Sequence, residues 1–565
     1  FFLLDAAQHP DLPGDARKPA AGKYNCSTRH GLDPTRQPLA ATKREALTAG
    51  MPTIEDIHPG PTVSVTGGRV QGIRAGANFA WRGIPYARAP EGDLRFRAPQ
   101  PVEEWTGIRR AWDFGNVATQ AYRGQFRGVG PGVPSGEDCL NLNVLRPADA
   151  DIPPEGMPVM VFIHGGGYAA GSSRDLLSQG DAFVRSGEVI FVSFNYRLSV
   201  LGYLDFSTFT TPERPFEGNL GLRDQVAALR WVSDNIRAFG GDPDNVTVLG
   251  ESAGGNAVTT LFATPSAAGL FARGIAESSP ANAVYGHRLA TKWAVEFVEI
   301  LSGLHPGEEI SATRLLTETS ATDLVTAMVT LQIRTPDADP GTFCLAPNVD
   351  GDFLPEHPMD AFRSGRAHRV PLIIGTNDRE GSLFRGRIDI LPRSPARIRA
   401  LLRTGARSAR EPLRAAYPGL PSTRTTADFA GDFAFWYPSL KVAELHSRFA
   451  PAYSYRFDLA PRLLRVVGLD ATHGVELLAL IDPADAPLLR AITVLGGRQP
   501  FALAGLRMRR YWLAFAVTGR LSGSWPAYRE PDRLTLVFET TDRVESDPRA
   551  ARRLAWDEFH RVPRS

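Results

Sequence analysis

Short runs of consecutive apolar residues recur along the chain, each bounded by glycine, proline or polar positions. Four such runs cover residues 159–163, 189–192, 246–249 and 372–374. Strands buried on both faces of a parallel sheet have this composition. Between the second and third runs, the apolar side chains of residues 222–239 recur at steps of three and four, which predicts an amphipathic helix. Strands that alternate with helices predict an α/β protein, in which a large, mostly parallel, doubly wound sheet carries helices on both faces.

The segments around this central pattern predict smaller elements. Residues 63–70 alternate apolar and polar positions around a Gly-Gly pair, which predicts a hairpin. Residues 283–345 and 395–445 show mixed helical patterns, and we expect them to cover the upper rim of the sheet. Residues 1–52 are rich in proline, alanine, glycine and charge without a sustained apolar period, so they are predicted to be a disordered extension, with a small docked arm as the alternative. Residues 53–565 are predicted to form a single domain.

Charge and hydropathy exclude several classes of protein. The chain has 565 residues, with 63 Lys and Arg against 61 Asp and Glu, so its formal net charge is +2. A balance so close to zero gives no basic field for nucleic acid. Hydrophobic residues make up 43% of the chain, enough for a large core, yet no apolar run approaches the ~20 residues that span a bilayer. We therefore expect a globular protein without a nucleic-acid partner or a membrane span.

The cysteines indicate neither a disulfide scaffold nor a metal site. There are three, Cys26, Cys139 and Cys344, and none has the spacing of a zinc ligand. At most one disulfide could form, so a reducing compartment, the cytoplasm, is the expected location. No bound metal is expected.

The stretch Gly250-Glu251-Ser252-Ala253-Gly254 is the strongest chemical signal. It directly follows the apolar run 246–249 and precedes a helix-compatible stretch, residues 253–262. A serine between a strand and a helix requires a sharp turn, and the two flanking glycines let strand and helix approach closely. Such a turn lifts the hydroxyl of Ser252 clear of the sheet, as a nucleophile requires. The alternative is a tight turn with a structural role alone.

A serine nucleophile also requires donors for an oxyanion, and the chain offers a glycine loop that fits this role. His164-Gly165-Gly166-Gly167 follows the buried run 159–163. Backbone N–H groups of such a loop, with that of the residue after the serine, form the oxyanion hole of many esterases. Gly166, Gly167 and Ala253 are therefore the expected donors. A phosphate-binding loop is the alternative, but the lysine of that motif is missing, so no nucleotide cofactor is expected.

Taken together, these features resemble the type B carboxylesterase, or cholinesterase-like, family of the α/β-hydrolase fold. Besides the serine turn and the glycine loop, the resemblance rests on four groups of residues. They are Trp81-Arg82-Gly83-Ile84-Pro85-Tyr86 with Leu94-Arg95-Phe96, Glu137-Asp138-Cys139-Leu140-Asn141-Leu142-Asn143, Asn195-Tyr196-Arg197, and Phe239-Gly240-Gly241-Asp242-Pro243. The resemblance extends from about residue 53 to the C-terminus and implies a serine hydrolase.

The resemblance also implies the partners of Ser252. A glutamate followed by glycine after a strand matches Glu380, and a histidine followed by glycine and a nearby glutamate matches His473. Glu380 is then the triad acid and His473 the general base, in the chain order of this fold. From the residues alone, Asp378 stays an alternative acid, and His164 is expected to have a structural role.

Further expectations follow from the same resemblance. Glu251 and Ser278 are expected in the second layer around the triad. Two buried ion pairs are implied, Arg95 with Glu137 and Arg197 with Asp224. Cys139 lacks the upstream cysteine with which many relatives pair it, and is expected to be free. Tyr168 and the segment 283–345 are expected to shape the pocket.

The predicted function is hydrolysis of carboxylic esters through an acyl-enzyme on Ser252, with a small-molecule ester as the partner and no cofactor. Hydrolysis of amides or carbamates by the same triad is the first alternative. A non-catalytic, esterase-like binding module is the second, although such proteins usually lose a triad member and all three are present here.

Overall fold

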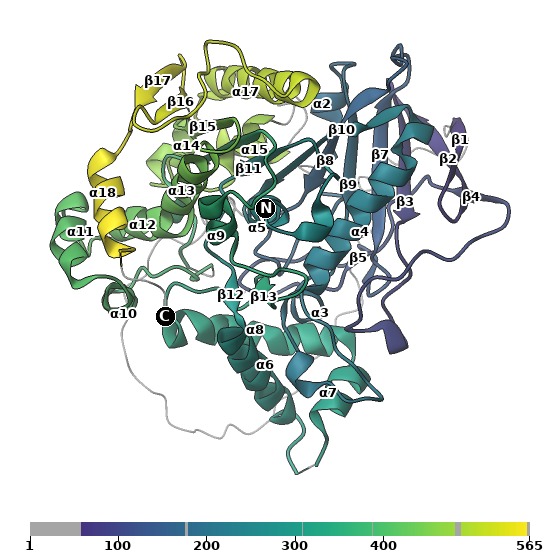
Figure 1. Ribbon diagram of the computed structural model, residues 1–565, viewed down its shortest axis with the longest axis horizontal. Coiled ribbons are helices and arrows are strands. Elements are labelled where there is room, and N and C mark those ends of the chain that lie inside the picture. Colours follow the sequence, from purple (N-terminus) through teal and green to yellow (C-terminus); the bar gives the residue numbers. More distant parts are fainter. Residues whose placement is uncertain (1–57, 176–178, 308, 387, 481–486, 562–565) are drawn as a thin grey trace, which may run out of the picture.

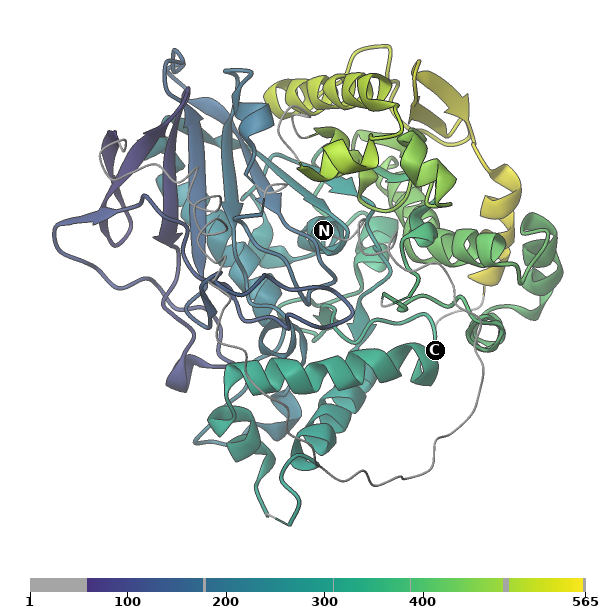
Figure 2. The same cartoon turned by 180° about the vertical axis from the view of Figure 1, so that it is seen from behind.

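The computed structural model describes residues 58–175, 179–307, 309–386, 388–480 and 487–561. Within these residues, one large sheet of thirteen strands runs through the centre of the molecule, and helices pack on both of its faces (Figures 1 and 2). The extension predicted for residues 1–52 lies outside the described residues. The structure therefore has the mixed α/β architecture with a large central sheet that the sequence predicts.

The sheet is antiparallel at both ends and parallel in between. Along the sheet the strands are ordered β1-β2-β3-β7-β9-β8-β10-β11-β14-β15-β16-β17, and β4 pairs with β2. Every neighbouring pair from β9 through β16 is parallel. The strands of the sheet are β1 (Pro59–Val65), β2 (Gly68–Ala75), β3 (Asn78–Pro85), β4 (Ile108–Arg110), β7 (Asn141–Pro147), β8 (Met157–Ile163), β9 (Ile190–Phe194), β10 (Gly241–Glu251), β11 (Arg273–Glu277), β14 (Leu372–Asn377), β15 (Ala452–Phe457), β16 (Leu534–Phe538) and β17 (Arg543–Ser546).

The four apolar runs of the sequence are the buried strands β8, β9, β10 and β14, and β1 and β2 form the predicted hairpin. β10 is longer than its apolar run. It begins at Gly241, which pairs with Met157, and the register then shifts before Val246. The hydrophobic pattern misses this first part because residues 242–245 are polar or proline, and backbone pairing rather than side-chain burial makes it a strand.

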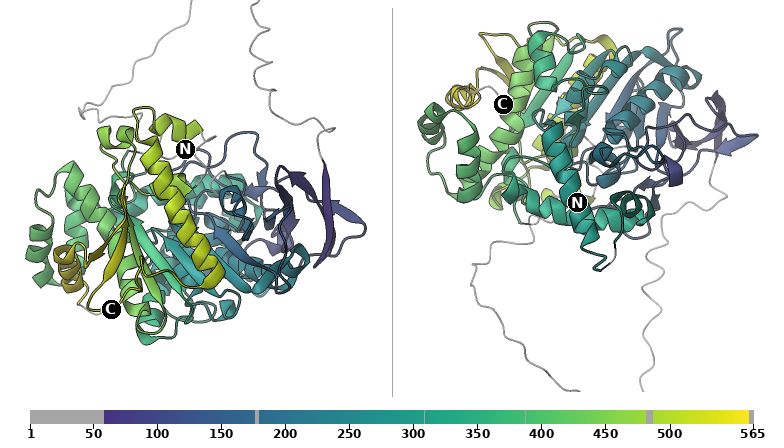
Figure 3. Two further views of the ribbon diagram at one scale, coloured as in Figure 1. Left: turned by 90° about the horizontal axis from the view of Figure 1, so that it is seen from above. Right: turned by 60° about the horizontal axis from the view of Figure 1, so that its bottom comes forward.

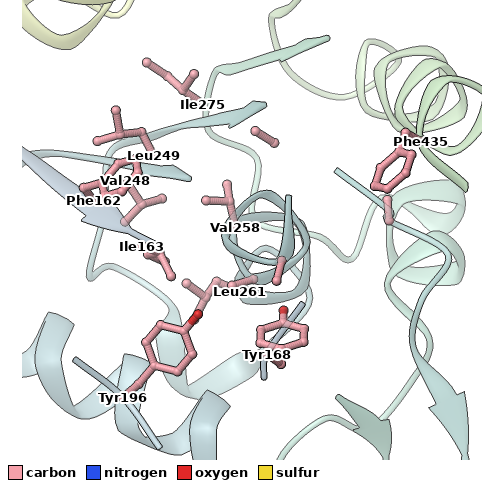
Figure 4. Packing of buried hydrophobic residues seen from close by; sticks show 14 of the residues in the cluster. Phe162, Ile163, Tyr168, Tyr196, Val248, Leu249, Val258, Leu261, Ile275 and Phe435 are labelled. Atoms are coloured by element: carbon pink, nitrogen blue, oxygen red, sulfur yellow. The ribbon is translucent and has the colours of Figure 1, made fainter. Parts of the chain in front are cut away.

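Successive residues of β11 show how the two faces of the sheet are covered. A Cβ on Gly274 would lie 2.6 Å from the ring of Phe262, at the end of helix α5 (Ala253–Leu261). Glu277 lies three residues further along β11, so its side chain points to the other face of the sheet. It accepts a hydrogen bond of 2.6 Å from Trp512 of α17 (Arg498–Thr518). Because side chains alternate across a strand, α5 and α17 cover opposite faces. Figure 3 shows α17 lying across the sheet, and Figure 4 shows Val258 and Leu261 of α5 among the side chains of the strands.

The segment 283–345 is largely helical, as predicted, and consists mainly of α6 (His287–Ser302), α7 (Ala312–Glu318) and α8 (Ala321–Ala338). These helices lie together below the sheet in Figures 1 and 2. The other α-helices are α2 (Asp181–Val184), α3 (Val200–Tyr203), α4 (Leu220–Asn235), α9 (Pro358–Ser364), α10 (Pro395–Thr404), α11 (Arg410–Ala416), α12 (Thr423–Gly431), α13 (Tyr437–His446), α14 (Arg462–Val466), α15 (Val475–Leu480), α16 (Pro487–Ile492) and α18 (Ala550–Phe559).

Both ion pairs that the resemblance implies are present. Arg197 and Asp224 are buried and make two side-chain contacts, of 2.6 and 2.8 Å. Arg95 and Glu137 also make two contacts, of 2.5 and 2.8 Å. Removing one partner of the buried pair would leave an uncompensated charge, typically at a cost of ~3–5 kcal/mol, so Arg197 and Asp224 fix the loop that follows β9. The pair of Arg95 and Glu137, which follows β3, is only partly buried.

Candidate active site

Ser252 lies at the junction between β10 and α5, in a strained backbone conformation. Its φ is +60° and its ψ is −120°. A Cβ on Gly250 would lie 2.5 Å from the carbonyl of Gly254, and one on Gly254 would lie 2.0 Å from the oxygen of Ile163. Larger residues at either position would therefore push the strand and the helix apart. The fold holds Ser252 at the edge of the sheet, where its side chain lines a pocket.

The glycine loop after β8 provides backbone donors next to this serine. Gly166 and Gly167 have φ values of +110° and +61°, a region that suits glycine. A Cβ on Gly166 would lie 2.1 Å from the carbonyl oxygen of Ala170. Within the described residues, the N–H groups of Gly166, Gly167 and Ala253 have no hydrogen-bond acceptor. Gly166 and Gly167 are half-buried, and Gly167 and Ala253 line the pocket beside Ser252, so these donors are free to bind a ligand there.

Glu380 and His473 are brought together beside the serine turn. Glu380 lies three residues after β14, and His473 lies in the loop before α15. Nδ1 of the buried His473 is 2.5 Å from Oε2 of the buried Glu380. The backbone N–H of Asn377 donates to the other oxygen of Glu380 at 2.6 Å. Segments 93 residues apart in the sequence thus form one carboxylate–imidazole pair.

The other ring nitrogen of His473 faces Glu251. Nε2 lies 3.2 Å from Oε1 of Glu251, and within the described part of the chain neither atom makes a hydrogen bond. The Ser252 hydroxyl is therefore not hydrogen-bonded to Nε2 in this structure. Catalytic hydrogen bonds are often long before substrate binds and tighten in the complex.

Burial and charge act in opposite directions on this pair. Burial raises the pKa of Glu251 to about 7, although the nearby His473 lowers it in part. Burial alone would lower the pKa of His473, but the negative charges of Glu251 and Glu380 outweigh it, so that pKa is raised above its ordinary value. The imidazole thus takes up a proton more readily than an ordinary histidine does.

A hydrogen-bonded network holds Glu380 from behind. The Ser278 hydroxyl lies 2.7 Å from Glu380 and 2.9 Å from Glu476, and the side chain of Asn377 donates to Glu476. The Ser278 hydroxyl is thus shared between the two carboxyl groups. Burial and the neighbouring Glu380 raise the pKa of Glu476 well above its usual range. Ser278 therefore contacts Glu380 directly.

Sequence reasoning did not single out Asn377 and Glu476. The sequence offers one signal for each, because Asn377 precedes Glu380 by three residues and Glu476 follows His473 by three. Spacing alone does not show that the two side chains meet.

The alternative residues are engaged elsewhere. Asp378 accepts a hydrogen bond from Arg549 and lies 4.0 Å from Arg456, so its carboxylate belongs to a separate ion-pair cluster. The ring of His164 stacks on that of Tyr196, with ring centroids 4.5 Å apart, and burial lowers the pKa of His164 to about 4. His164 is therefore a neutral packing residue.

A pocket opens above Ser252 and contains about 610 Å³ of empty space, its opening included. Tyr168 and residues of the segment 283–345 line it, as the sequence analysis expects. Much of the wall is apolar and includes Phe126, Phe343, Leu345, Phe384, Ile390 and Phe435. No lining residue carries a charge, so the pocket suits an uncharged, largely apolar molecule.

Neither a metal site nor a membrane-spanning helix is present among the described residues. No group of three or more His, Cys, Asp or Glu side chains is placed to hold a metal ion. None of the helices is both long enough and apolar enough to cross a membrane. Cys139 and Cys344 are buried and free, as expected for Cys139.

Comparison with known proteins gives consistent matches over most of the chain. Residues 59–404 match the Carboxylesterase family. The chain is 35% identical to para-nitrobenzyl esterase of Bacillus subtilis over 494 residues, which covers 86% of this chain and 96% of the relative. It is 30% identical to fumonisin B1 esterase of Sphingopyxis macrogoltabida, covering 82% and 83%.

Solved structures of esterases also match this chain over most of its length. A structure titled PNB esterase matches with a TM-score of 0.77 at 33% identity, covering 87% of this chain and 99% of the other. A carboxylesterase of Geobacillus stearothermophilus matches with a TM-score of 0.73, also at 33% identity, covering 88% and 99%.

Proposed function

Since the chain belongs to the carboxylesterase family and hydrolyses carboxylic esters, we propose that Ser252, His473 and Glu380 perform this reaction through an acyl-enzyme. The observation that carries this proposal is the buried contact of 2.5 Å between Nδ1 of His473 and Glu380. That contact keeps the Nδ1 proton directed at the carboxylate and leaves the Nε2 lone pair available as a base.

The reaction then has two similar halves. Nε2 of His473 takes the proton of the Ser252 hydroxyl as its oxygen attacks the ester carbonyl. The tetrahedral oxyanion accepts hydrogen bonds from the N–H groups of Gly166, Gly167 and Ala253. Protonated His473 gives its proton to the leaving alcohol, and an acyl-serine remains. Water attacks the acyl-serine with the same base and the same donors, which releases the acid and restores the serine.

We propose that Glu251, in addition to Glu380, controls how well His473 acts as a base. As a carboxylate 3.2 Å from Nε2, it stabilises the positive charge that His473 acquires during attack. As a carboxylic acid, it donates its own proton to Nε2 and occupies the lone pair that Ser252 requires. The base is therefore effective only when the pair of Glu251 and His473 has lost a proton, so activity rises with pH.

The expected substrates are uncharged esters with apolar or aromatic groups, and a panel of substrates tests this. We expect measurable kcat/KM for p-nitrophenyl butyrate and for a para-nitrobenzyl ester, the latter because a relative is named for it. The matched anilide and carbamate should react at least ~100-fold more slowly, because nitrogen donation into the carbonyl makes it less electrophilic and an anilide is a poorer leaving group than a phenolate. A kcat/KM for the amide or the carbamate that equals or exceeds that of the ester would favour the alternative hydrolase activity.

Replacing Glu251 by Gln tests the charge at Nε2. The substitution keeps the size and removes the negative charge, so the pKa of His473 should fall. The acid limb of the profile of kcat/KM against pH should then move down by about one pH unit, and kcat should fall ~10-fold as the imidazolium loses support.

Glu277→Gln is the matched control for this measurement. Glu277 lies beside Glu251 in the register of β10 and β11, and burial raises its pKa to about 8, so near neutral pH the substitution removes little charge. We expect the acid limb of the kcat/KM profile of Glu277→Gln to stay at the wild-type pH. An acid limb that does not move in Glu251→Gln would contradict the role given to Glu251.

We also propose a reducing compartment, the cytoplasm, as the site of action. The support is that Cys139 and Cys344 are free thiols in the interior.

A further inference from the structure

The polar side chains in the wall of the pocket fall into two groups. Most of them are already hydrogen-bonded within the protein. Tyr168 donates to Asn256 at 2.7 Å, and Asn256 donates to the carbonyl of Pro280 at 2.9 Å. Thr335 and Thr342 each donate to a backbone carbonyl at 2.8 Å. These groups have little left to offer a substrate.

Gln125 and Gln332 form the second group. Both are buried, with 6% and 9% of their surface exposed. Within the described residues, neither carboxamide donates or accepts a hydrogen bond. Both residues line the pocket, and neither carboxamide is among the unpartnered polar atoms that are sealed from solvent. Besides Ser252 itself, they are the polar side chains of this wall that remain free to bind a ligand.

Their positions place them on different walls. Gln332 lies on α8, one turn before Pro336, which lines the same pocket. Gln125 precedes Phe126, whose ring lies 2.4 Å from where a Cβ of Gly167 would be, so it lies next to the glycine loop. Gln125 also lines an outer hollow with Tyr122, which places it where the pocket meets the surface. A molecule bound at Ser252 thus has one free carboxamide at the mouth of the pocket, on the side of the glycine loop, and another on the wall formed by α8.

Water can satisfy these carboxamides in the resting enzyme, but a ligand that displaces this water must replace its hydrogen bonds or lose affinity. A carboxamide donates two hydrogen bonds and accepts others, but it carries no charge. Its natural partner is therefore a neutral polar group, such as a ketone, an amide or a hydroxyl. The absence of charged residues from this wall excludes a strong preference for an ionised group.

We propose that Gln125 and Gln332 are specificity-determining residues, and that the preferred substrates carry a neutral hydrogen-bonding group in addition to the ester. This inference rests on the proposed function, because it concerns the same pocket and the same nucleophile. Sites built to hydrogen-bond a substrate discriminate strongly against analogues that lack the bonding group, because their own polar groups are then left unpaired.

Two pairs of esters test the proposal, one for each side of the ester bond. On the acyl side, p-nitrophenyl hexanoate is compared with p-nitrophenyl 5-oxohexanoate. On the alcohol side, pentyl acetate is compared with 4-oxopentyl acetate in a pH-stat. The quantity measured is the ratio of kcat/KM for the keto ester to that for the plain ester. We compare the wild type with Gln125→Leu, Gln332→Leu and the double variant.

The wild type should favour the keto ester in at least one pair. Each single substitution should lower that ratio by ~3–10-fold, and the double variant should lower it further. The intrinsic reactivity of each ester is the same with every variant, so it cancels in the comparison. Leu345→Met is the control, because it changes an apolar part of the same wall and should leave the ratio unchanged.

The plain esters separate this inference from the proposed function. Leucine suits an apolar wall, so both variants should still hydrolyse the plain esters and still react with a fluorophosphonate probe. Ratios that stay at the wild-type value in both pairs, with plain-ester activity retained, would overturn the role of the two glutamines and leave the esterase intact. Failure of the wild type to hydrolyse any of the plain esters would instead contradict the proposed function.

Discussion

Replacing Ser252 by Ala should lower kcat for p-nitrophenyl butyrate by ~10⁵–10⁶-fold. Without the hydroxyl no acyl-enzyme forms, and the remaining rate comes from oxyanion stabilisation and substrate binding alone. Labelling by a fluorophosphonate probe should disappear in the same variant. The melting temperature should stay close to that of the wild type, because the side chain of Ser252 makes no hydrogen bond within the described residues and alanine has much the same steric strain at this φ.

Ser439→Ala is the matched control for that result. This buried serine donates to the carbonyl oxygen of Ser279 and lies outside the pocket wall, so its loss should affect stability by about 1 kcal/mol and leave labelling intact. Turnover of the Ser252→Ala protein at the wild-type rate, after traces of wild-type enzyme are excluded, would remove this serine from the mechanism.

Replacing Glu380 by Gln should lower kcat by ~10³–10⁴-fold. The oxygen of glutamine can still accept from the N–H of Asn377, so the local structure should persist. Its amide nitrogen, however, would donate to Nδ1 of His473 and drive the ring proton to Nε2. A protonated Nε2 cannot accept the proton of Ser252, and substitutions that favour the wrong tautomer have effects of this size in other triads.

Asp378→Asn provides a sharp comparison, because it makes the same chemical change two residues away. Asp378 contacts Arg549 and Arg456 rather than His473, so kcat should change less than ~3-fold even if some stability is lost. A loss of activity in Asp378→Asn that equals the loss in Glu380→Gln would contradict the assignment of the acid.

The sequence was sufficient for those parts of the site that depend on local structure. The apolar runs predict the buried strands because burial on both faces of a parallel sheet requires apolar side chains. The turn at Ser252 and the loop at Gly166 follow from glycine spacing, since only small residues fit where strand and helix meet. Each of these features depends on residues that lie within a few positions of each other in the sequence, which is why they could be predicted.

The contacts that join distant segments could not be read from the residues in the same way. His473 and Glu380 were placed by family resemblance, because nothing local distinguishes His473 from other histidines. The network of Ser278, Asn377 and Glu476 depends on the ends of β11 and β14 meeting the start of α15. The free carboxamides of Gln125 and Gln332 depend on which of their neighbours are already satisfied, which is a property of the packed structure.

The three unpaired N–H groups of Gly166, Gly167 and Ala253 have a consequence for the evolution of heat resistance. An internal hydrogen bond to each donor would add about 0.5–1.5 kcal/mol to the folding stability, so the resting enzyme is less stable than its architecture would allow. Selection for thermal tolerance alone would favour substitutions that give these donors an internal acceptor, and each such gain would remove support from the transition state. Heat-tolerant variants that stay active should therefore carry their stabilising changes far from the glycine loop, in surface helices and sheet edges.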